Sequence, residues 1–232
     1  MTKMIPLFIL VGGILIVWLT GIYQYLSFDT LKENRALILN FVQNSFWNAL
    51  LIFALLYIVV VAMSIPGATF LTITAGFLFG SLLGTIIVVI SATLGATILF
   101  LIAKTSLGEK LRSKAVPWLQ KMEKGFKDNA LSYLLVLRLV PLFPFFIVNL
   151  VPAFLGVSAR TFVIATGLGI IPGSFVYVSV GTGLGSLFDQ GKNLSLQGVL
   201  SPDILVALGG LALLSMLPVF YKKIKGSDVP PK

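Results

Sequence analysis

The feature that most constrains this chain is the length of its stretches without charge. No Lys, Arg, Asp or Glu occurs between Ala36 and Ala103, nor within Thr161–Phe188 or Ile204–Tyr221. Only 11% of the 232 residues are charged and 57% are hydrophobic, whereas soluble domains carry about 25% charged residues. Apolar runs of about 18 or more residues are candidates for membrane spans. The sequence therefore predicts an all-α polytopic membrane protein.

The residue types that the chain lacks exclude several kinds of chemistry. It contains no Cys and no His, which excludes thiol chemistry, disulfides, Cys/His metal sites and Ser-His-Asp catalysis. No cluster of acid, base and nucleophile occurs, so we expect no enzyme activity and no catalytic, metal or cofactor site. No carboxylate lies in a predicted span, so a proton relay inside the membrane has no obvious member.

The positive charge is concentrated beside the predicted spans. The net charge is +9, with seven cations between Lys104 and Lys127 and four more after Tyr221. Basic residues that flank spans mark the cytoplasmic side and contact anionic lipid headgroups. The expected partners are therefore membrane lipids with anionic headgroups and not nucleic acid, and the sequence leaves a homo-oligomer open.

The ends of the chain are predicted to flank a central membrane core. Met4–Leu26 is expected to be an uncleaved anchor span. Ser27–Ser45 is expected to be a helix on the membrane surface with Asp29 as its N-cap, the alternative being an ordinary solvated linker helix. The predicted organisation is residues 1–45 (anchor span and surface helix), 46–188 (membrane core with a basic cytoplasmic loop at 104–128) and 189–232 (the last span, Ile204–Tyr221, and a disordered basic tail).

The first half of the core is predicted to begin with a helical hairpin. Phe46–Ala103 is too long for two spans of about 20 residues and short for three with loops. The turn signal Ser64-Ile65-Pro66-Gly67 lies in its middle, where hydrocarbon depth is expected. We therefore expect hairpin arms over Phe46–Ile65 and Ala68–Phe79 and a full span over Gly80–Ala103, the alternative being two plain spans with a kink. Gly76, Gly80 and Gly84 form a small-xxx-small ladder for close helix packing.

The second half contains an apolar stretch, Asn129–Arg160, that breaks the rules of a membrane span at its centre. It carries Arg138 and Asn149. It also contains three prolines, Pro141, Pro144 and Pro152, within a window of twelve residues. A charge in hydrocarbon costs roughly 2.5–3.5 kcal/mol on translocon scales, and each proline removes a backbone donor. We therefore expect this stretch to dip into the bilayer and turn back. The residues expected to shape the two hairpins are prolines and glycines: Pro66, Gly67, Gly76, Gly80, Pro141, Pro144, Pro152 and Gly156.

The distribution of cations predicts a topology. A cytoplasmic basic loop and a cytoplasmic C-terminus make Thr161–Gly185 an outgoing span, with a kink permitted by Gly167, Gly169 and Pro172. Four full spans and two re-entrant hairpins then place both termini in the cytoplasm. Shifting the sequence by 76 residues aligns Gly80 with Gly156, which predicts an inverted repeat. Gly181–Gly185 lacks the spacing of a phosphate loop and is expected to be a helix terminus and flexible loop.

Arg138 is the strongest candidate for a functional residue. It follows Asn129 by nine residues, which places it about 13 Å deep at 1.5 Å per residue. The alternatives are snorkelling to the headgroups or bonding to carbonyls that Pro141 and Pro144 leave free. A guanidinium without an intramembrane carboxylate suits a transient anion, and phosphate fits its planar fork. We expect Asn149 to add a hydrogen bond and the opposite hairpin to add hydroxyls, from Thr69, Thr72 and Thr74.

Two segments together resemble a known family. They are RLVPLFPFFIVNLVPAFLGV, from Arg138 to Val157, and SIPGATFLTITAGFLFG, from Ser64 to Gly80. They are similar to the DedA superfamily and, more closely, to its VTT-domain, SNARE-associated Golgi protein branch, over about Phe46–Gly185. The resemblance implies two facing re-entrant hairpins and a role in lipid scrambling or transport of polyprenyl phosphates. It also implies that the family's embedded arginine, prolines and asparagine correspond to Arg138, Pro141, Pro144 and Asn149.

These observations predict an integral membrane lipid transporter or scramblase. It would move phospholipid or polyprenyl-phosphate headgroups through a polar groove between the hairpins. The transporters of the superfamily carry acidic residues near the first hairpin, whereas Ser64–Gly80 has none, which favours passive scrambling over proton coupling. The alternatives are a transporter of small anions or ions and a non-transporting membrane-organising protein. The absence of a transit-like leader favours a bacterial cytoplasmic membrane.

Overall fold

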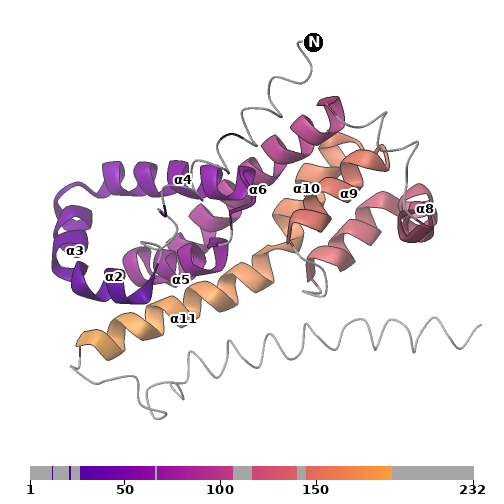
Figure 1. Cartoon of the computed structure of the whole chain (residues 1–232). Coiled ribbons are helices and arrows are strands. Elements are labelled where there is room, and N and C mark those ends of the chain that lie inside the picture. Colours follow the sequence, from indigo (N-terminus) through magenta and orange to yellow (C-terminus); the bar gives the residue numbers. More distant parts are fainter. Residues whose placement is uncertain are drawn as a thin grey trace, which may run out of the picture.

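A computed structural model describes residues 12, 21, 27–65, 67–106, 117–139 and 145–189. The predicted span Ile204–Tyr221 lies outside the described residues, as do Met4–Leu26 apart from Gly12 and Gly21, and Pro66, Pro141 and Pro144. The described segments are helical and contain no strand (Figure 1). The helices are α2 (Phe28–Glu33), α3 (Arg35–Asn44), α4 (Phe46–Ala62), α5 (Ala68–Phe79), α6 (Ser81–Ser106), α8 (Pro117–Leu139), α9 (Phe145–Phe154), α10 (Ala159–Gly169) and α11 (Ile171–Asp189).

The described apolar helices differ in whether they are long enough to cross a membrane. Among the described residues, Ser81–Thr105 is long and apolar enough to cross a membrane as one helix. Two pairs reach that length only when joined across a bend: α3 with α4, at 117°, and α10 with α11, at 40°. The kink predicted within Thr161–Gly185 is therefore confirmed. Pro172 is the second residue of α11, in the first turn, where an amide N–H would have no acceptor within the helix.

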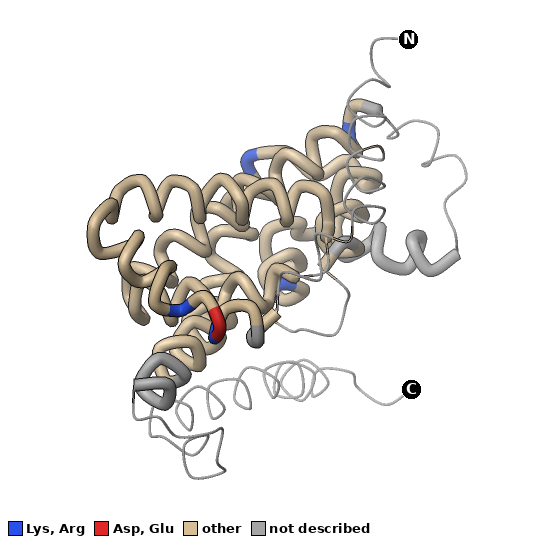
Figure 2. The backbone as a smooth tube through the Cα atoms, turned by 60° about the vertical axis from the view of Figure 1, so that its left-hand side comes forward, with Lys and Arg blue, Asp and Glu red and all other residues tan. Residues whose placement is uncertain are grey.

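The surface of these helices is apolar rather than charged. Trp47 on α4 and Leu82 on α6 are 76% and 75% exposed. Figure 2 shows that the described helices are uncharged over most of their length. Exposed apolar patches of this extent are rare on soluble monomers, whereas in a bilayer they face lipid tails. This is the surface of an integral membrane protein.

Helices α4 and α5 form an antiparallel hairpin, as the turn signal predicted. The ring of Phe79, at the end of α5, packs edge-on against Phe46 and Phe53 on α4. Near the turn, the hydroxyls of Tyr57 and Thr72 lie 2.8 Å apart. Both observed helices end within three residues of the predicted arms. The chain therefore reverses between residues 63 and 67.

The turn begins with an unusual helix cap. The amides of Ser64 and Ile65 donate to the carbonyls of Val61 and Val60, which is the Schellman pattern. The residue in the left-handed position is Ser64, with φ 52°. Glycine normally occupies this position because it has no Cβ penalty. Gly67, with φ 152°, then leads into α5.

The glycine ladder expected over Gly76, Gly80 and Gly84 is correct at two positions and wrong at one. A Cβ on Gly76 would lie 1.8 Å from the carbonyl oxygen of Val178 on α11, and one on Gly84 would lie 2.9 Å from that of Ala75. Gly80 has open space around it and φ 75°, so it separates α5 from α6 and does not bring two helices into close contact. The prediction failed because spacing alone does not distinguish packing glycines from turn glycines.

Helix α5 packs closely along α11, far away in sequence (Figure 1). Gly181 faces Ile73, whose carbonyl oxygen would lie 1.8 Å from an added Cβ. Thr182 reinforces the contact, because its hydroxyl donates to the carbonyl of Gly76 at 3.2 Å. The expectation of a helix terminus and flexible loop at Gly181–Gly185 is therefore wrong: this segment lies inside α11 and forms a helix interface.

The second half of the core is interrupted as predicted. Asn129, with φ −158° and ψ 82°, kinks α8, and its apolar portion ends at Leu139. Helix α9 contains Pro152 and ends in a second Schellman cap, whose left-handed residue is Gly156 with φ 79°. Asn129–Gly156 is thus not one straight helix.

The N-terminal surface helix differs from its prediction at the cap. Ser27, not Asp29, caps α2, because its hydroxyl accepts from the amide of Thr30 at 3.2 Å. Asp29 instead lies in the first turn of α2. A break at Asn34 also divides the predicted helix into α2 and α3. A Ser two residues before the expected cap offers the same capping chemistry, and the sequence did not distinguish the two.

A candidate anion site between the two halves

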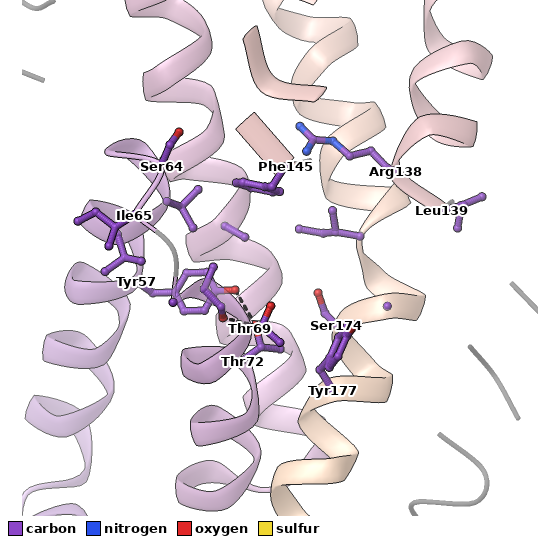
Figure 3. Close-up of a pocket in the computed structure, with 17 residues that line it drawn as sticks. Tyr57, Ser64, Ile65, Thr69, Thr72, Arg138, Leu139, Phe145, Ser174 and Tyr177 are labelled. Atoms are coloured by element: carbon purple, nitrogen blue, oxygen red, sulfur yellow. Dashed lines mark hydrogen bonds between the residues drawn. The ribbon is translucent and has the colours of Figure 1, made fainter. Parts of the chain in front are cut away.

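A cavity of about 400 Å³ lies between the turn of the first hairpin, the end of α8 and the start of α11 (Figure 3). Arg138 contributes the charged side chain among its described lining residues. Its polar wall also contains hydroxyl groups, and its remaining wall is apolar. The hydroxyl-bearing side chains are those of Tyr57, Ser64, Thr69, Thr72, Ser174 and Tyr177.

Arg138 and Asn149, both expected to contact the anion, are instead bonded to each other, and Asn149 does not line the cavity. Nη2 of Arg138 donates to Oδ1 of Asn149 at 2.6 Å and to Oγ1 of Thr166 at 2.9 Å. Asn149 and Thr166 are fully buried. A straight helix would separate positions 138 and 149 by about 16 Å, so this contact requires the chain to fold back between α8 and α9. The side chain of Arg138 is therefore held by α9 and α10.

Two aromatic rings flank the guanidinium. Its carbon lies 5.3 Å from the ring centre of Phe162 and 5.5 Å from that of Phe145. Figure 3 shows the Arg138 side chain reaching from α8 toward Phe145. Both distances are within the range of cation–π attraction, which is worth more when the cation is desolvated. The rings therefore compensate part of the cost of placing a charge at this depth.

Helix α10 presents a stripe that fits Arg138. Phe162, Thr166 and Gly169 follow each other at intervals of four and three residues, which places them on one helix face. An added Cβ on Gly169 would lie 2.6 Å from Cβ of Arg138. The three residues thus provide an aromatic face, a hydrogen-bond acceptor and room for the side-chain stem.

The charge of Arg138 is not neutralised by the described residues. Its side-chain partners are two neutral oxygens, and it makes no ion pair within the described part of the chain. Nε of Arg138 and Nδ2 of Asn149 are buried without a hydrogen-bond partner there. A partly buried cation whose only described hydrogen-bond partners are neutral oxygens favours an anionic ligand. The arrangement can therefore bind an oxyanion at the wall of the cavity.

The threonines predicted for the site divide into three cases. Thr69 lines the cavity and is exposed. Thr72 lines it too, but its hydroxyl donates to the carbonyl of Ala68 at 2.7 Å, so the O–H of Tyr57 must donate to Thr72. Thr74 donates to the carbonyl of Phe70 and borders a separate apolar cavity beneath α2 and α3. The expectation for Thr74 is therefore wrong, because it lies on another face of α5.

Several residues that form the site were not expected from the sequence analysis. Tyr57 comes from α4, Phe145 from α9, Phe162 and Thr166 both from α10, and Ser174 from α11. Only the stripe on α10 carries a sequence signal, in the spacing of Phe162, Thr166 and Gly169. No group of His, Cys, Asp and Glu that could hold a metal occurs among the described residues.

The fold and the site define an all-helical integral membrane protein with a cation beside an internal cavity. Residues 65–183 match the VTT domain family. The chain is 34% identical over 174 residues to Transmembrane protein 41B of Rattus norvegicus, covering 73% of this chain and 57% of that protein. The Homo sapiens protein of the same name is 33% identical over 174 residues, again covering 73% of this chain and 57% of that protein.

A relative from another organism matches a larger part of the chain. The chain is 31% identical over 201 residues to the Transmembrane protein 41 homolog of Dictyostelium discoideum, covering 85% of this chain and 58% of that protein. No solved structure matches the chain. The chain spans less than two thirds of the length of these relatives. It belongs to the VTT-domain family of the DedA superfamily.

Proposed function

We propose that this protein moves the phosphate-bearing headgroups of lipids across the bilayer through the cavity at Arg138. The observation that carries this proposal is the guanidinium of Arg138, fixed by neutral partners at the wall of a cavity of about 400 Å³. Arginine binds phosphate through a planar fork, and buried cations within membranes usually mark a substrate path. The exposed apolar helices around the cavity leave the lipid tails in hydrocarbon while the headgroup crosses.

The proposed path lies between two re-entrant hairpins related by an inverted repeat. A shift of 76 residues carries α5 (Ala68–Phe79) onto α9 (Phe145–Phe154). It also carries Gly80 onto Gly156, whose φ angles are 75° and 79°. Helix α5 packs on α11 of the second half, and α9 packs on α6 of the first. This exchange of contacts supports a pseudo-twofold arrangement, in which broken helices meet near the midplane.

The same arrangement has a defined orientation in the proposal. The basic loop at 104–128 faces the cytoplasm, and both termini lie on that side, because cationic loops are retained there. Headgroup movement is passive, since no carboxylate side chain borders the cavity among the described residues. Lipids would then move in both directions without an energy source.

The test is lipid movement in liposomes that contain the purified protein. A fluorescent phospholipid in the inner leaflet is protected from a membrane-impermeant quencher until it reaches the outer leaflet. We expect wild-type protein to expose the lipid and Arg138→Ala to lose this activity. Arg138→Lys tests the fork, because a single ammonium does not offer two parallel donors to phosphate. Loss of activity in Arg138→Lys supports recognition of phosphate by two donors. Full activity would mean that a single positive charge at position 138 is sufficient.

Two other functions are outcomes of the same experiment. Flux of small anions without lipid movement would make the cavity a closed aqueous path. Absence of both, in protein that retains its helix content and thermal unfolding transition, would leave a membrane-organising protein. Equal lipid movement by wild type and Arg138→Ala would contradict the proposed route.

A further inference from the structure

Lys104 makes an unusual pair of contacts at the end of α6. Its ammonium donates to the backbone carbonyl of Val157 at 2.7 Å. Val157 follows Gly156, the left-handed residue between α9 and α10. The same ammonium lies 5.5 Å from the ring centre of Phe100, one helical turn earlier on α6. Lys104 therefore joins the span of the first half to the connection that leads into α10.

These contacts continue through the core to Arg138. The rings of Phe100 and Phe162 are stacked, with centres 4.2 Å apart and planes inclined by 18°. Both phenylalanines are fully buried. The guanidinium of Arg138 lies beside the ring of Phe162, at 5.3 Å. Lys104, Phe100, Phe162 and Arg138 thus form one column of a cation, two stacked rings and a second cation.

We propose that Lys104 is a positioning residue for Arg138. It acts by two routes that converge on α10. The bond to Val157 fixes the start of α10, and the column sets the position of Phe162. Helix α10 also holds Thr166, which accepts from Arg138. A shift of α10 would therefore move an aromatic face and a hydrogen-bond acceptor of the guanidinium together.

The closeness of the packing makes this coupling direct. Phe162 is fully buried, so its ring has no free volume in which to absorb a shift of Phe100. Gly169 leaves no space between α10 and the stem of Arg138, where an added Cβ would be 2.6 Å from Cβ of the arginine. A simple headgroup anchor would instead leave Arg138 unchanged when Lys104 is replaced.

The most specific test observes the Arg138 side chain itself. The chain has four arginines, Arg35, Arg112, Arg138 and Arg160, so a sample labelled with ¹⁵N-arginine gives few Nε–H signals. Arg138→Lys identifies the Arg138 signal by removing it. Ring currents from Phe145 and Phe162 should displace this signal from the position of a solvent-exposed arginine.

We expect Lys104→Met to shift or broaden the Arg138 signal, because it removes the ammonium and keeps an apolar chain of similar length. Lys104→Arg adds a fifth arginine signal and should restore the Arg138 signal to its wild-type position, since a guanidinium can donate to the carbonyl and face the ring. Lys32→Met is the matched control: Lys32 is an exposed cation on α2, and its removal should leave the Arg138 signal in place. An unchanged Arg138 signal in Lys104→Met would overturn the proposal.

A second variant covers the case in which Lys104→Met does not fold. Phe100→Leu removes the stacked ring and keeps the lysine. It should shift the Arg138 signal alone among the four, and a wild-type signal position in this variant would overturn the column. The spectra do not require transport, so a protein that moves no lipid would contradict only the proposed function. If the proposed function holds, Lys104→Met should slow lipid movement about tenfold, whereas Lys32→Met should not.

Discussion

The interface between α5 and α11 gives a quantitative prediction about packing. Alanine at Gly76 would place a Cβ 1.8 Å from the carbonyl oxygen of Val178, whereas real Cβ contacts stay above 3.0 Å. The opposing atom is backbone, so no rotamer change can relieve the overlap, and the two helices must separate by about 1 Å or more. Overpacking of this kind costs about 1–3 kcal/mol.

A glycine on α11, the helix that packs against α5, serves as a matched control and isolates this cost. Gly173, near the start of α11, has no atom within 4 Å of its added Cβ. Both substitutions gain helix propensity, up to about 1 kcal/mol. The difference between Gly76→Ala and Gly173→Ala therefore measures the packing term. In a chain of this size it corresponds to a midpoint for Gly76→Ala about 2–12 °C below that of Gly173→Ala.

The assay is thermal unfolding of detergent-solubilised protein, followed by tryptophan fluorescence. Gly181→Ala should behave like Gly76→Ala, because its Cβ would meet the carbonyl of Ile73 on the same interface. The double variant Gly76→Ala/Gly181→Ala should lower the unfolding midpoint by less than the sum of the two single decreases, since one separation of α5 from α11 relieves both overlaps. Equal midpoints for Gly76→Ala and Gly173→Ala would refute the reasoning, and strictly additive losses would show that the sites do not share one interface.

Three further substitutions probe the site and the first turn. Asn149→Asp supplies the carboxylate that Arg138 lacks, so we expect retained or raised thermal stability together with lost lipid movement; unimpaired movement would show that a free cation is not needed. Gly169→Ala pushes on Cβ of Arg138 and should slow lipid movement in the liposome assay, with unchanged rates counting against a fixed arginine. Ser64→Gly removes the Cβ from a residue with a left-handed φ of 52°, so it should raise the free energy of unfolding by about 0.5–1 kcal/mol and with it the unfolding midpoint. A lower midpoint would mean that the hydroxyl of Ser64 contributes more to stability than the backbone strain costs.

The helix boundaries of the core could be predicted because turn-forming residues interrupt otherwise uniform apolar sequence. The Ser64–Gly67 turn signal separates α4 from α5, and the left-handed Gly80 and Gly156 end α5 and α9. These effects are local, since they depend on backbone freedom at one or two residues. Local chemistry was not sufficient at the cap of α2, where Ser27 and Asp29 compete for the same role.

The partners of Arg138 could be predicted only in part, because they depend on which helix faces meet. Asn149 was expected at the site because a polar amide in an apolar helix is conspicuous, but it was expected to bond the anion and not Arg138. Phe145 and Phe162 were not expected at the site, since aromatic residues are common in membrane helices and only their position beside the guanidinium gives them a role. Gly181 was misread for the same reason: its function is a contact with Ile73, more than a hundred positions away.

The central claim is that Arg138 presents an unneutralised charge to a cavity within the membrane, and cysteine accessibility tests it directly. The chain contains no cysteine, so Ser174→Cys introduces a single thiol at the cavity wall. We predict that membrane-impermeant thiol reagents label this position, that an anionic reagent reacts faster than a cationic one, and that Arg138→Ala removes this preference. Ile90→Cys, on the outer surface of α6, should stay unlabelled. No labelling at position 174, or equal rates for both reagents, would contradict the account.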